Sequence, residues 1–202
     1  MKIVLATHNR HKVEEMKAIL VDPLGDLKDR IEILSLEDFP EIGEIVEDGE
    51  TLEENARKKA RTVFEKTSVL SLADDTGLEV DALDGRPGVY SARYSGEGAT
   101  YLRNNQKLLK ELEGIPQKNR TAKFRCVISI IGDRIDDLAI GEVKGKIGTE
   151  MHGENGFGYD PLFIPHGYEI TYAEMGSQVK NRVSHRSLAL EQAKKILYRL
   201  TT

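Results

Sequence analysis

Two adjacent carboxylates, Asp74 and Asp75, follow a short run of aliphatic residues over 69–73. The run is typical of a strand covered on both faces, because it is brief, apolar and bounded by polar residues and glycine. Ligands of open α/β sheets bind beyond the carboxyl ends of strands, so an acidic pair there is well placed to hold a divalent cation or to act as a base. We expect the pair at the carboxyl end of the strand, with Thr76 and Gly77 turning the chain. The alternative is that the pair lies in a solvated turn, since Asp, Thr and Gly are ordinary turn residues.

A polar turn with several cations joins an expected strand over 2–6 to an expected helix over 12–20. The start of a helix offers free backbone N–H groups and the positive end of the helix dipole, which together bind anions. Cations are disfavoured at that position, and a bound phosphate would offset the cost. The plainer alternative is that these long side chains extend into water. The residues that would contact the phosphate are Thr7, His8, Asn9, Arg10, His11 and Lys12.

A second helix that begins with cations is expected over 184–200, with Ser184 as its N-cap. His185 and Arg186 lie in its first turn, and Lys180 lies just upstream. Two helix starts with the same unfavourable polarity strengthen the case for a polyanionic ligand. The G-x-x-x-x-G-K-[ST] pattern of a Walker loop is absent from the sequence, so this is a different kind of phosphate site.

The loop over 153–161 contains three glycines and two aromatic residues. Glycine lets the backbone approach a ligand closely. Phe157 and Tyr159 could stack on a planar base, while Asp160 could bond an edge of the base or hold the loop. A structural loop with aromatic anchors is an equally good interpretation.

Upstream of the acidic pair, Thr51 and Glu54 form a capping box that predicts a helix over 52–64. Glu47 precedes this helix and is a candidate second metal ligand, although a solvated loop acid is the plainer interpretation. The remaining expected features are strands over 31–34, 78–83, 122–131, 138–147 and 162–164, a helix over 100–112, a turn-rich connector over 22–29, irregular segments over 36–45 and 165–175, and a long loop over 84–98.

Composition bounds the class of protein. The 202 residues suffice for one well-cored domain, and 39% hydrophobic and 31% charged residues are ordinary for a globular chain. No apolar run could cross a bilayer and no signal peptide is recognisable, so we expect a cytoplasmic protein without membrane contact. The formal net charge of −5 argues against direct binding to nucleic acid. The single cysteine, Cys126, excludes an intramolecular disulfide and lies on the apolar face of an expected strand.

Five motifs occur together and in order along the chain. They are Thr7-x-Asn-x-x-Lys12, Ala73-Asp-Asp-Thr-Gly77, Gly85-x-Pro-Gly-x-Tyr-Ser-Ala-Arg-Tyr-Ser-Gly96, Gly156-Phe-Gly-Tyr-Asp-Pro161 and Ser184-His-Arg186. In this combination the sequence resembles the inosine triphosphate pyrophosphatase family, the Ham1-like non-canonical purine nucleoside triphosphatases, from about residue 2 to 198. The resemblance implies an α/β fold with a mixed twisted sheet and flanking helices, in which a single domain over 1–202 forms two lobes around a central cleft. It also implies a homodimer.

The resemblance further implies hydrolysis of ITP, dITP and XTP to the monophosphate and pyrophosphate, with Mg²⁺ as cofactor. Asp75 would be the proton acceptor and, with Glu47, a metal ligand, although Asp48 or Glu50 could be the true counterpart of Glu47. The residues over 7–12 would bind the triphosphate, and Thr76 would contact the substrate. The residues implied for the base pocket are Phe157, Gly158, Tyr159, Asp160, Lys180, His185 and Arg186.

Selection of the base follows in part from hydrogen bonding. Hypoxanthine and xanthine carry a 6-oxo acceptor where adenine has an amino donor, so a donor such as Arg186 or Lys180 disfavours adenine. Guanine shares the 6-oxo group, and the sequence shows no feature that rejects it. Three alternatives stay open: a phosphomonoesterase of the haloacid dehalogenase type, although its Asp-x-Asp motif is absent at this strand; a non-catalytic nucleotide-binding regulator; and a housekeeping hydrolase of dTTP or dUTP.

Overall fold

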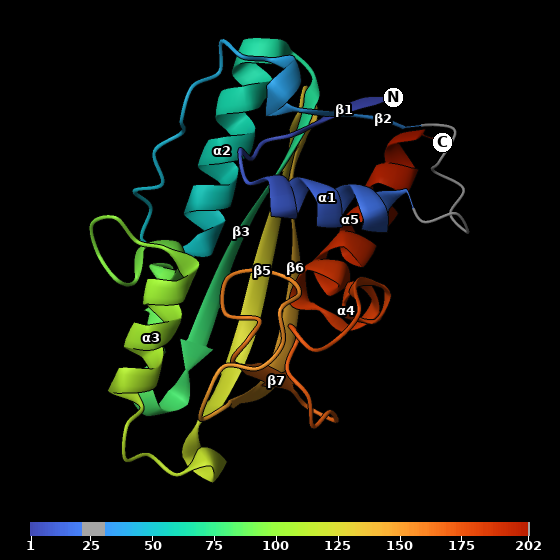
Figure 1. Cartoon of the computed structure of the whole chain (residues 1–202). Helices are drawn as coiled ribbons and strands as arrows, with labels where there is room; N and C mark the ends of the chain where they lie inside the picture. Colours follow the sequence, from blue (N-terminus) through green and yellow to red (C-terminus); the bar gives the residue numbers. More distant parts are fainter. Residues whose placement is uncertain (22–30, 202) are drawn as a thin grey trace. The chain divides into compact units, whose positions relative to one another are not determined.

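The computed structural model describes residues 1–21 and 31–201, and the connector predicted over 22–29 lies outside the described residues. The chain divides into two compact units (Figure 1). Unit 1 comprises Met1–Asp75, Cys126–Gly141 and Arg186–Thr202, and unit 2 comprises Thr76–Arg125 and Glu142–His185. Three strands run along the chain from one unit into the other, and each unit has its own hydrophobic core.

The elements in the described part of the chain are the strands β1 (Lys2–Leu5), β2 (Glu32–Ser35), β3 (Leu70–Val80), β4 (Pro87–Gly88), β5 (Thr121–Gly132), β6 (Ile135–Ile147) and β7 (Phe163–Pro165), and the α-helices α1 (Arg10–Leu20), α2 (Leu52–Thr67), α3 (Tyr101–Glu111), α4 (Ser177–Val183) and α5 (His185–Thr201). Short 3-10 helices cover Leu36–Asp38, Asp81–Leu83, Ser91–Arg93 and Gln117–Asn119. The strand order is β2-β1-β3-β5-β6-β7, with β4 beside β3. β1 is parallel to β2 and β3, whereas β4 is antiparallel to β3 and β7 to β6, so the sheet is mixed as expected for the α/β class.

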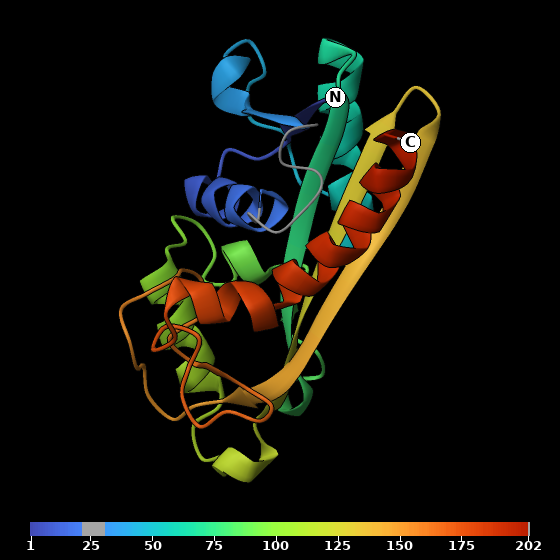
Figure 2. The ribbon, with the colours of Figure 1, turned by 90° about the vertical axis from the view of Figure 1, so that its right-hand side faces the viewer.

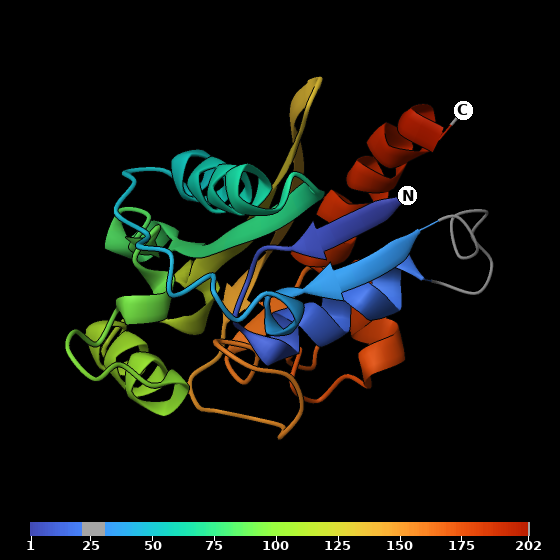
Figure 3. The same cartoon turned by 90° about the horizontal axis from the view of Figure 1, so that it is seen from above.

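In unit 1 the two faces of the sheet are covered by different helices (Figure 3). One face packs against α1 and α5, and its buried residues include Leu5, Leu72 and Ile128. The opposite face packs against α2 through Val4 and Ala73. Because successive side chains of a strand point to opposite faces, β1, β2, β3 and β5 each contribute to both layers.

β3 differs from the sequence prediction. We expected one strand to end at Asp74 and Asp75 and a turn at Thr76 and Gly77, but β3 continues from Leu70 to Val80 through all four residues. The prediction was wrong because local turn preference was overridden by burial: Gly77 is buried, and both aspartates are buried beside cations. The carboxylates therefore lie in the middle of a strand and not at its end.

The hairpin of β5 and β6 confirms the strand prediction for this region, although β6 begins three residues earlier than expected. In unit 1, α5 lies along this hairpin (Figure 2). Gln192 Oε1 accepts a hydrogen bond from the Ile140 N–H at 3.3 Å. Cys126 is fully buried in the same core, as its place on the apolar face of the strand indicated.

Unit 2 is built around Phe124, Leu108 and Phe163, with α3 packing on the core through Leu108. The sequence did not predict α4, because its seven residues are too few for an apolar stripe and include the buried Lys180. Across residues 1–21 and 31–201, no helix combines the length and apolarity that a bilayer crossing requires.

We expect Leu190→Ala in α5 to lower the free energy of unfolding by about 2–5 kcal/mol, because Leu190 is fully buried in the unit 1 core and truncation leaves a cavity. The matched control is Leu188→Ala on the same helix, where the side chain is 41% exposed and the change should stay within about 0.5 kcal/mol. Urea denaturation followed by circular dichroism measures both. Equal losses in the two variants would contradict the packing described for α5.

Candidate active site

Asp74 is the centre of a buried ion cluster in unit 1. It is 0% exposed, and its Oδ2 accepts hydrogen bonds from Arg186 Nη2 at 2.9 Å and Arg186 Nε at 3.2 Å. Lys12 Nζ lies 3.2 Å from the same oxygen, and Arg186 Nη1 contacts Glu15 Oε2 at 2.5 Å. Burial favours the neutral carboxyl, but Lys12, Arg186 and the more distant Lys59 outweigh it and hold the pKa of Asp74 far below its ordinary value. Asp74 is therefore an ionised structural anion.

Asp75 faces the opposite side of β3, toward α2, as strand alternation requires. Its Oδ1 lies 3.5 Å from Lys59 Nζ, and the same ammonium group donates to Glu47 Oε1 at 2.5 Å and to the carbonyl oxygen of Asp74 at 2.7 Å. Lys59 is 5% exposed and Asp75 6% exposed. One buried lysine thus joins both predicted metal ligands.

The environment of Asp75 is less favourable to charge than that of Asp74. Burial raises the pKa of Asp75, Lys59 and Lys12 lower it, and the negative charges of Glu47 and Asp74 raise it, so that the pKa lies above its ordinary value. Burial would lower the pKa of Lys59, but Asp75, Asp74 and Glu47 outweigh burial and raise it. The arrangement sets a basic carboxylate against a charged lysine, which is suited to proton abstraction.

The turn before α1 is organised by its own side chains. Asn9 is the N-cap of α1, and its Oδ1 accepts from the N–H groups of His11 at 3.1 Å and Lys12 at 3.3 Å. Thr7 Oγ1 accepts from the Asn9 N–H at 3.2 Å. Two of the N–H groups that the sequence suggested for an anion are therefore used by Asn9. The side chains of His8, Arg10 and His11 are exposed, and Arg10 contacts Glu37 at 3.1 Å.

Unit 2 holds most of the residues predicted for the base pocket. Lys180 Nζ donates to Asp160 Oδ2 at 2.6 Å, and both side chains are buried. The Phe157 N–H donates to the same carboxylate oxygen at 2.8 Å, and Lys180 Nζ lies 4.9 Å from the centre of the Phe157 ring. Phe157, Asp160 and Lys180 thus form a compact group of an aromatic face, an acceptor and a cation.

The other predicted residues of unit 2 are mainly anchors. Tyr159 is 4% exposed, and its hydroxyl donates to the Ser91 carbonyl at 2.9 Å. The His185 ring is buried and stacks on Phe124 with ring centres 4.4 Å apart. Thr76 follows Asp75 in β3 and is half-buried. Arg186, predicted for the base pocket, lies in unit 1 and contacts Asp74 and Glu15, so that role stays a prediction.

Glu47 and Asp75 are the residues that fit a divalent cation. Asp75 Oδ2 is buried and has no hydrogen-bond partner among the described residues, which is costly unless another group contacts it. The described residues contain no group of three or more His, Cys, Asp or Glu side chains suited to hold a metal. Two carboxylates alone suit Mg²⁺, because Mg²⁺ in phosphate-transfer sites takes its other ligands from phosphates and water.

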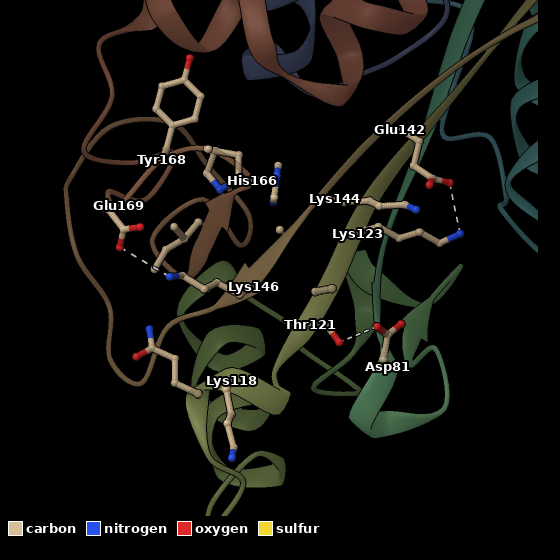
Figure 4. Close-up of a pocket in the computed structure, with 16 residues that line it drawn as sticks. Asp81, Lys118, Thr121, Lys123, Glu142, Lys144, Lys146, His166, Tyr168 and Glu169 are labelled. Carbon is tan, nitrogen blue, oxygen red and sulfur yellow. Dashed lines mark hydrogen bonds and ion pairs between the residues drawn. The ribbon is translucent and has the colours of Figure 1, made fainter.

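A separate groove of ≈ 880 Å³ lies in unit 2 and contains none of the predicted site residues (Figure 4). Lys123 contacts Glu142 at 3.1 Å, Lys146 contacts Glu169 at 3.6 Å, and the Thr121 hydroxyl donates to a neighbouring carboxylate, Asp81, at 2.6 Å. Opposite charges paired across strands are typical of the solvent-facing side of a sheet. This groove therefore does not displace the Asp75 cluster as the candidate active site.

Comparison with known proteins decides the family. The model of the Ham1 family matches residues 3–196 of the chain. The chain belongs to the Ham1 family. This Ham1-family chain is 51% identical to the dITP/XTP pyrophosphatase of Desulforamulus reducens, over 99% of this chain and 97% of that protein. It is 50% identical to the dITP/XTP pyrophosphatase of Geobacter sulfurreducens, over 94% of this chain and 92% of that protein.

Solved structures of Ham1-family proteins have the same fold. A HAM1 protein from Coxiella burnetii superposes with a TM-score of 0.86 at 40% identity, covering 98% of this chain and 99% of that one. A nucleoside-triphosphatase, dITP/XTP pyrophosphatase, from Mycobacterium abscessus superposes with a TM-score of 0.74 at 39% identity, covering 96% of this chain and 98% of that one. The α/β fold class inferred from the motifs is thereby confirmed.

Sequence reasoning missed Lys59, which links Asp75 to Glu47 in this Ham1-family protein. A signal was present: Lys59 lies between Ala56 and Ala60 on the apolar stripe of α2, where a lysine must be buried or extend out of the core. The structure also separates Glu47 from its neighbour Asp48. Glu47 contacts the buried Lys59, whereas Asp48 contacts the surface residue Lys58 at 2.5 Å.

We expect Arg186→Met to lower the free energy of unfolding by about 3–5 kcal/mol, because it leaves the charge of Asp74 buried with only part of its compensation. Arg10→Met is the control, since Arg10 is 83% exposed and its ion pair with Glu37 should contribute about 0–1 kcal/mol. Chemical denaturation at neutral pH in the presence of a chelator measures the loss of unfolding free energy in both variants. A loss of under about 1 kcal/mol for Arg186→Met would show that Asp74 does not depend on the guanidinium.

The contribution of the Asp74–Arg186 pair to the free energy of unfolding should depend on pH. Because the pKa of Asp74 is lower in the folded than in the unfolded protein, its contribution to stability is present above the ordinary carboxyl pKa of about 4 and is lost as the pH falls below it. Arg186→Met raises the folded pKa, so the variant should lose less stability than the wild type between about pH 5 and pH 3. Denaturation curves at several pH values in this range measure the two slopes. Equal slopes of the unfolding free energy against pH in the two proteins would contradict the role of Arg186 in lowering the pKa of Asp74.

Proposed function

We propose that this protein hydrolyses ITP, dITP and XTP to the nucleoside monophosphate and pyrophosphate. The observation that carries the proposal is Asp75, a buried carboxylate with a raised pKa. One of its oxygens lies beside Lys59, and the other has no hydrogen-bond partner within residues 1–21 and 31–201. The curated relatives from Desulforamulus reducens and Geobacter sulfurreducens, named dITP/XTP pyrophosphatases, support dITP and XTP as substrates.

In the proposed reaction, Asp75 Oδ2 accepts a hydrogen bond from a water molecule and takes its proton as the water oxygen attacks the α-phosphorus. The bond between the α-phosphorus and the bridging oxygen breaks, and pyrophosphate leaves with the electron pair. A raised pKa makes the Asp75 carboxylate a stronger base than an ordinary aspartate. Lys59 keeps this carboxylate oriented through Oδ1, which leaves Oδ2 for the water.

The negative charge of the triphosphate requires cations near it. Lys12 and the exposed side chains of His8, Arg10 and His11 belong to one turn and helix start, and we assign them to the phosphates. Glu47 and Asp75 would hold Mg²⁺, which when bound neutralises phosphate charge and makes the α-phosphorus more electrophilic.

The purine is assigned to unit 2. The Phe157 ring offers a stacking surface, and the Lys180 ammonium can donate to the 6-oxo group of hypoxanthine or xanthine while Asp160 holds it in place. Adenine presents an amino donor at the same position and would leave Lys180 without an acceptor from the base. Lys180 is a stronger candidate for this contact than Arg186, whose guanidinium is buried against Asp74 and Glu15.

A pyrophosphate-release assay over ITP, dITP, XTP, GTP, ATP and dTTP, with and without Mg²⁺, tests the function. We expect Mg²⁺-dependent pyrophosphate from the first three substrates and little turnover of the others. Orthophosphate as the first product would favour a phosphomonoesterase, and binding without turnover would favour a regulator. Strong turnover of dTTP would favour a housekeeping nucleotide hydrolase.

The remaining parts of the proposal rest on the family resemblance, for the oligomeric state, and on composition and net charge, for the location and the binding partners. We propose that the protein acts as a homodimer in the cytoplasm and binds neither nucleic acid nor membrane. Light scattering after size-exclusion chromatography measures the oligomeric state. Fractionation of cells measures the location.

Asp75→Asn should reduce kcat by about 10²–10⁴, the usual contribution of a general base, because the amide cannot accept the proton from water. We expect the variant to keep the circular dichroism spectrum of the wild type, since an amide has the size of a carboxyl group. Steady-state pyrophosphate release measures the loss. A kcat near the wild-type value would remove Asp75 from the role of proton acceptor.

Glu47→Gln should raise the Mg²⁺ concentration for half-maximal activity by about 10-fold or more, because one of the two carboxylates that would hold the cation is lost. Asp48→Asn is the matched control, since the neighbouring Asp48 contacts only the exposed Lys58 among the described residues. Mg²⁺ titrations of activity and calorimetric titrations of Mg²⁺ measure both variants. The assignment fails if Asp48→Asn has the larger effect.

A further inference from the structure

Helix α3 carries two adjacent buried asparagines that contact different loops of unit 2. Asn104 and Asn105 are each 2% exposed. Asn104 holds the segment after Ser91: its Nδ2 donates to the Ala92 carbonyl at 3.0 Å, and its Oδ1 accepts from the Ser95 N–H at 2.8 Å. Asn105 Nδ2 instead donates to the Gly158 carbonyl at 2.8 Å. The two side chains are chemically identical but stabilise different segments.

The contact of Asn105 lies inside the loop assigned to the purine. Gly158 lies between Phe157 and Tyr159, and its φ of +64° is a conformation that favours glycine. Asn105 Nδ2 also donates to the Tyr101 carbonyl at 2.8 Å. One buried amide group therefore joins the first turn of α3 to the backbone beside Phe157.

The loop that carries the Phe157 ring is held by tertiary hydrogen bonds, among them the bond from the Asn155 N–H to the Ala173 carbonyl at 3.1 Å. The residues over 150–156 are exposed, and Gly153 and Gly156 also have positive φ angles, so local preference does little to fix the loop. Asp160 holds the Phe157 N–H from inside the loop, and Asn105 holds the next carbonyl from outside it. The Tyr101 ring, with its centre 6.0 Å from that of Phe157, comes from the same turn of α3 that Asn105 contacts.

We propose that Asn105 is a positioning residue for base recognition. By fixing Gly158 on α3, it holds the Phe157 ring and Asp160 in the arrangement that receives the purine, and it thereby sets KM and the preference for a 6-oxo base. Asn105 is assigned to positioning of the base alone, and not to triphosphate binding or proton transfer. Its substitution should therefore leave kcat nearly unchanged. The inference rests on the proposed function of the Phe157 loop.

Asn105→Ser separates the two contacts of Asn105. A serine hydroxyl in a helix can donate to the carbonyl four residues earlier, which is that of Tyr101, but it is too short to reach Gly158. We expect KM for dITP to rise about 5- to 10-fold, the scale of one lost hydrogen bond, with kcat within about 2-fold of the wild type. The ratio of kcat/KM for dITP over dATP should fall. Asn105→Asp, which matches the shape but cannot donate when ionised, should give the same pattern and serves if the serine variant fails to fold.

Asn104→Ser is the matched control, because it removes an equally buried amide one position away. It should lower stability to a similar extent and leave KM for dITP within about 2-fold. Amide hydrogen exchange provides a readout that does not depend on catalysis: exchange over 156–160 should accelerate in Asn105→Ser and not in Asn104→Ser.

The outcomes separate this inference from the proposed function. Absence of pyrophosphate release from dITP by the wild type would overturn the proposed function, while the exchange measurement would still test whether Asn105 fixes the loop. If the wild type is active, equal KM changes in the Asn104 and Asn105 variants, a fall in kcat alone, or unchanged exchange over 156–160 would each overturn the role of Asn105.

Discussion

The structure of unit 1 depends on a carboxylate in a position where burial of its charge is energetically unfavourable. Asp74 lies fully buried in the middle of β3, and moving a charge out of water costs several kcal/mol unless partners replace the solvent. Lys12 from α1 and Arg186 from α5 are those partners, and Glu15 balances the second half of the guanidinium. The charges therefore fix how two helices lie on one face of the strand, in addition to the apolar packing below them. A substitution at any one member leaves the charges of the others only partly compensated.

Strand geometry explains how two neighbouring aspartates acquire opposite properties. Successive side chains of β3 point to opposite faces, so Asp74 meets two cations while Asp75 meets Lys59 together with a further carboxylate, Glu47. The pKa of Asp74 is lowered and that of Asp75 is raised, although the two residues are the same and adjacent. Neighbouring titratable groups whose pKa values diverge in this way are typical of sites that carry out acid–base chemistry.

Much of the fold could be predicted from the sequence, and the failures have identifiable causes. The capping box of Thr51 and Glu54 predicted the start of α2, because both of its hydrogen bonds are local. The prediction of a turn at Thr76 and Gly77 was wrong. Cations from distant parts of the chain compensate the buried charges of the two aspartates, so that the strand continues through them, and the sequence alone does not show these contacts. The candidate residues were named from motifs, but their partners were not. Lys59 was overlooked since a lysine in a helix is ordinarily a surface residue.

The ammonium group of Lys59 also bears on how the protein rests between reactions. Glu47 and Asp75 both contact it, so their mutual repulsion is relieved by a covalently attached cation that can never diffuse away. In the proposed reaction, Glu47 and Asp75 would also hold Mg²⁺, which would supply further positive charge when bound. The charge compensation of these two carboxylates is therefore built into the sequence of α2 itself.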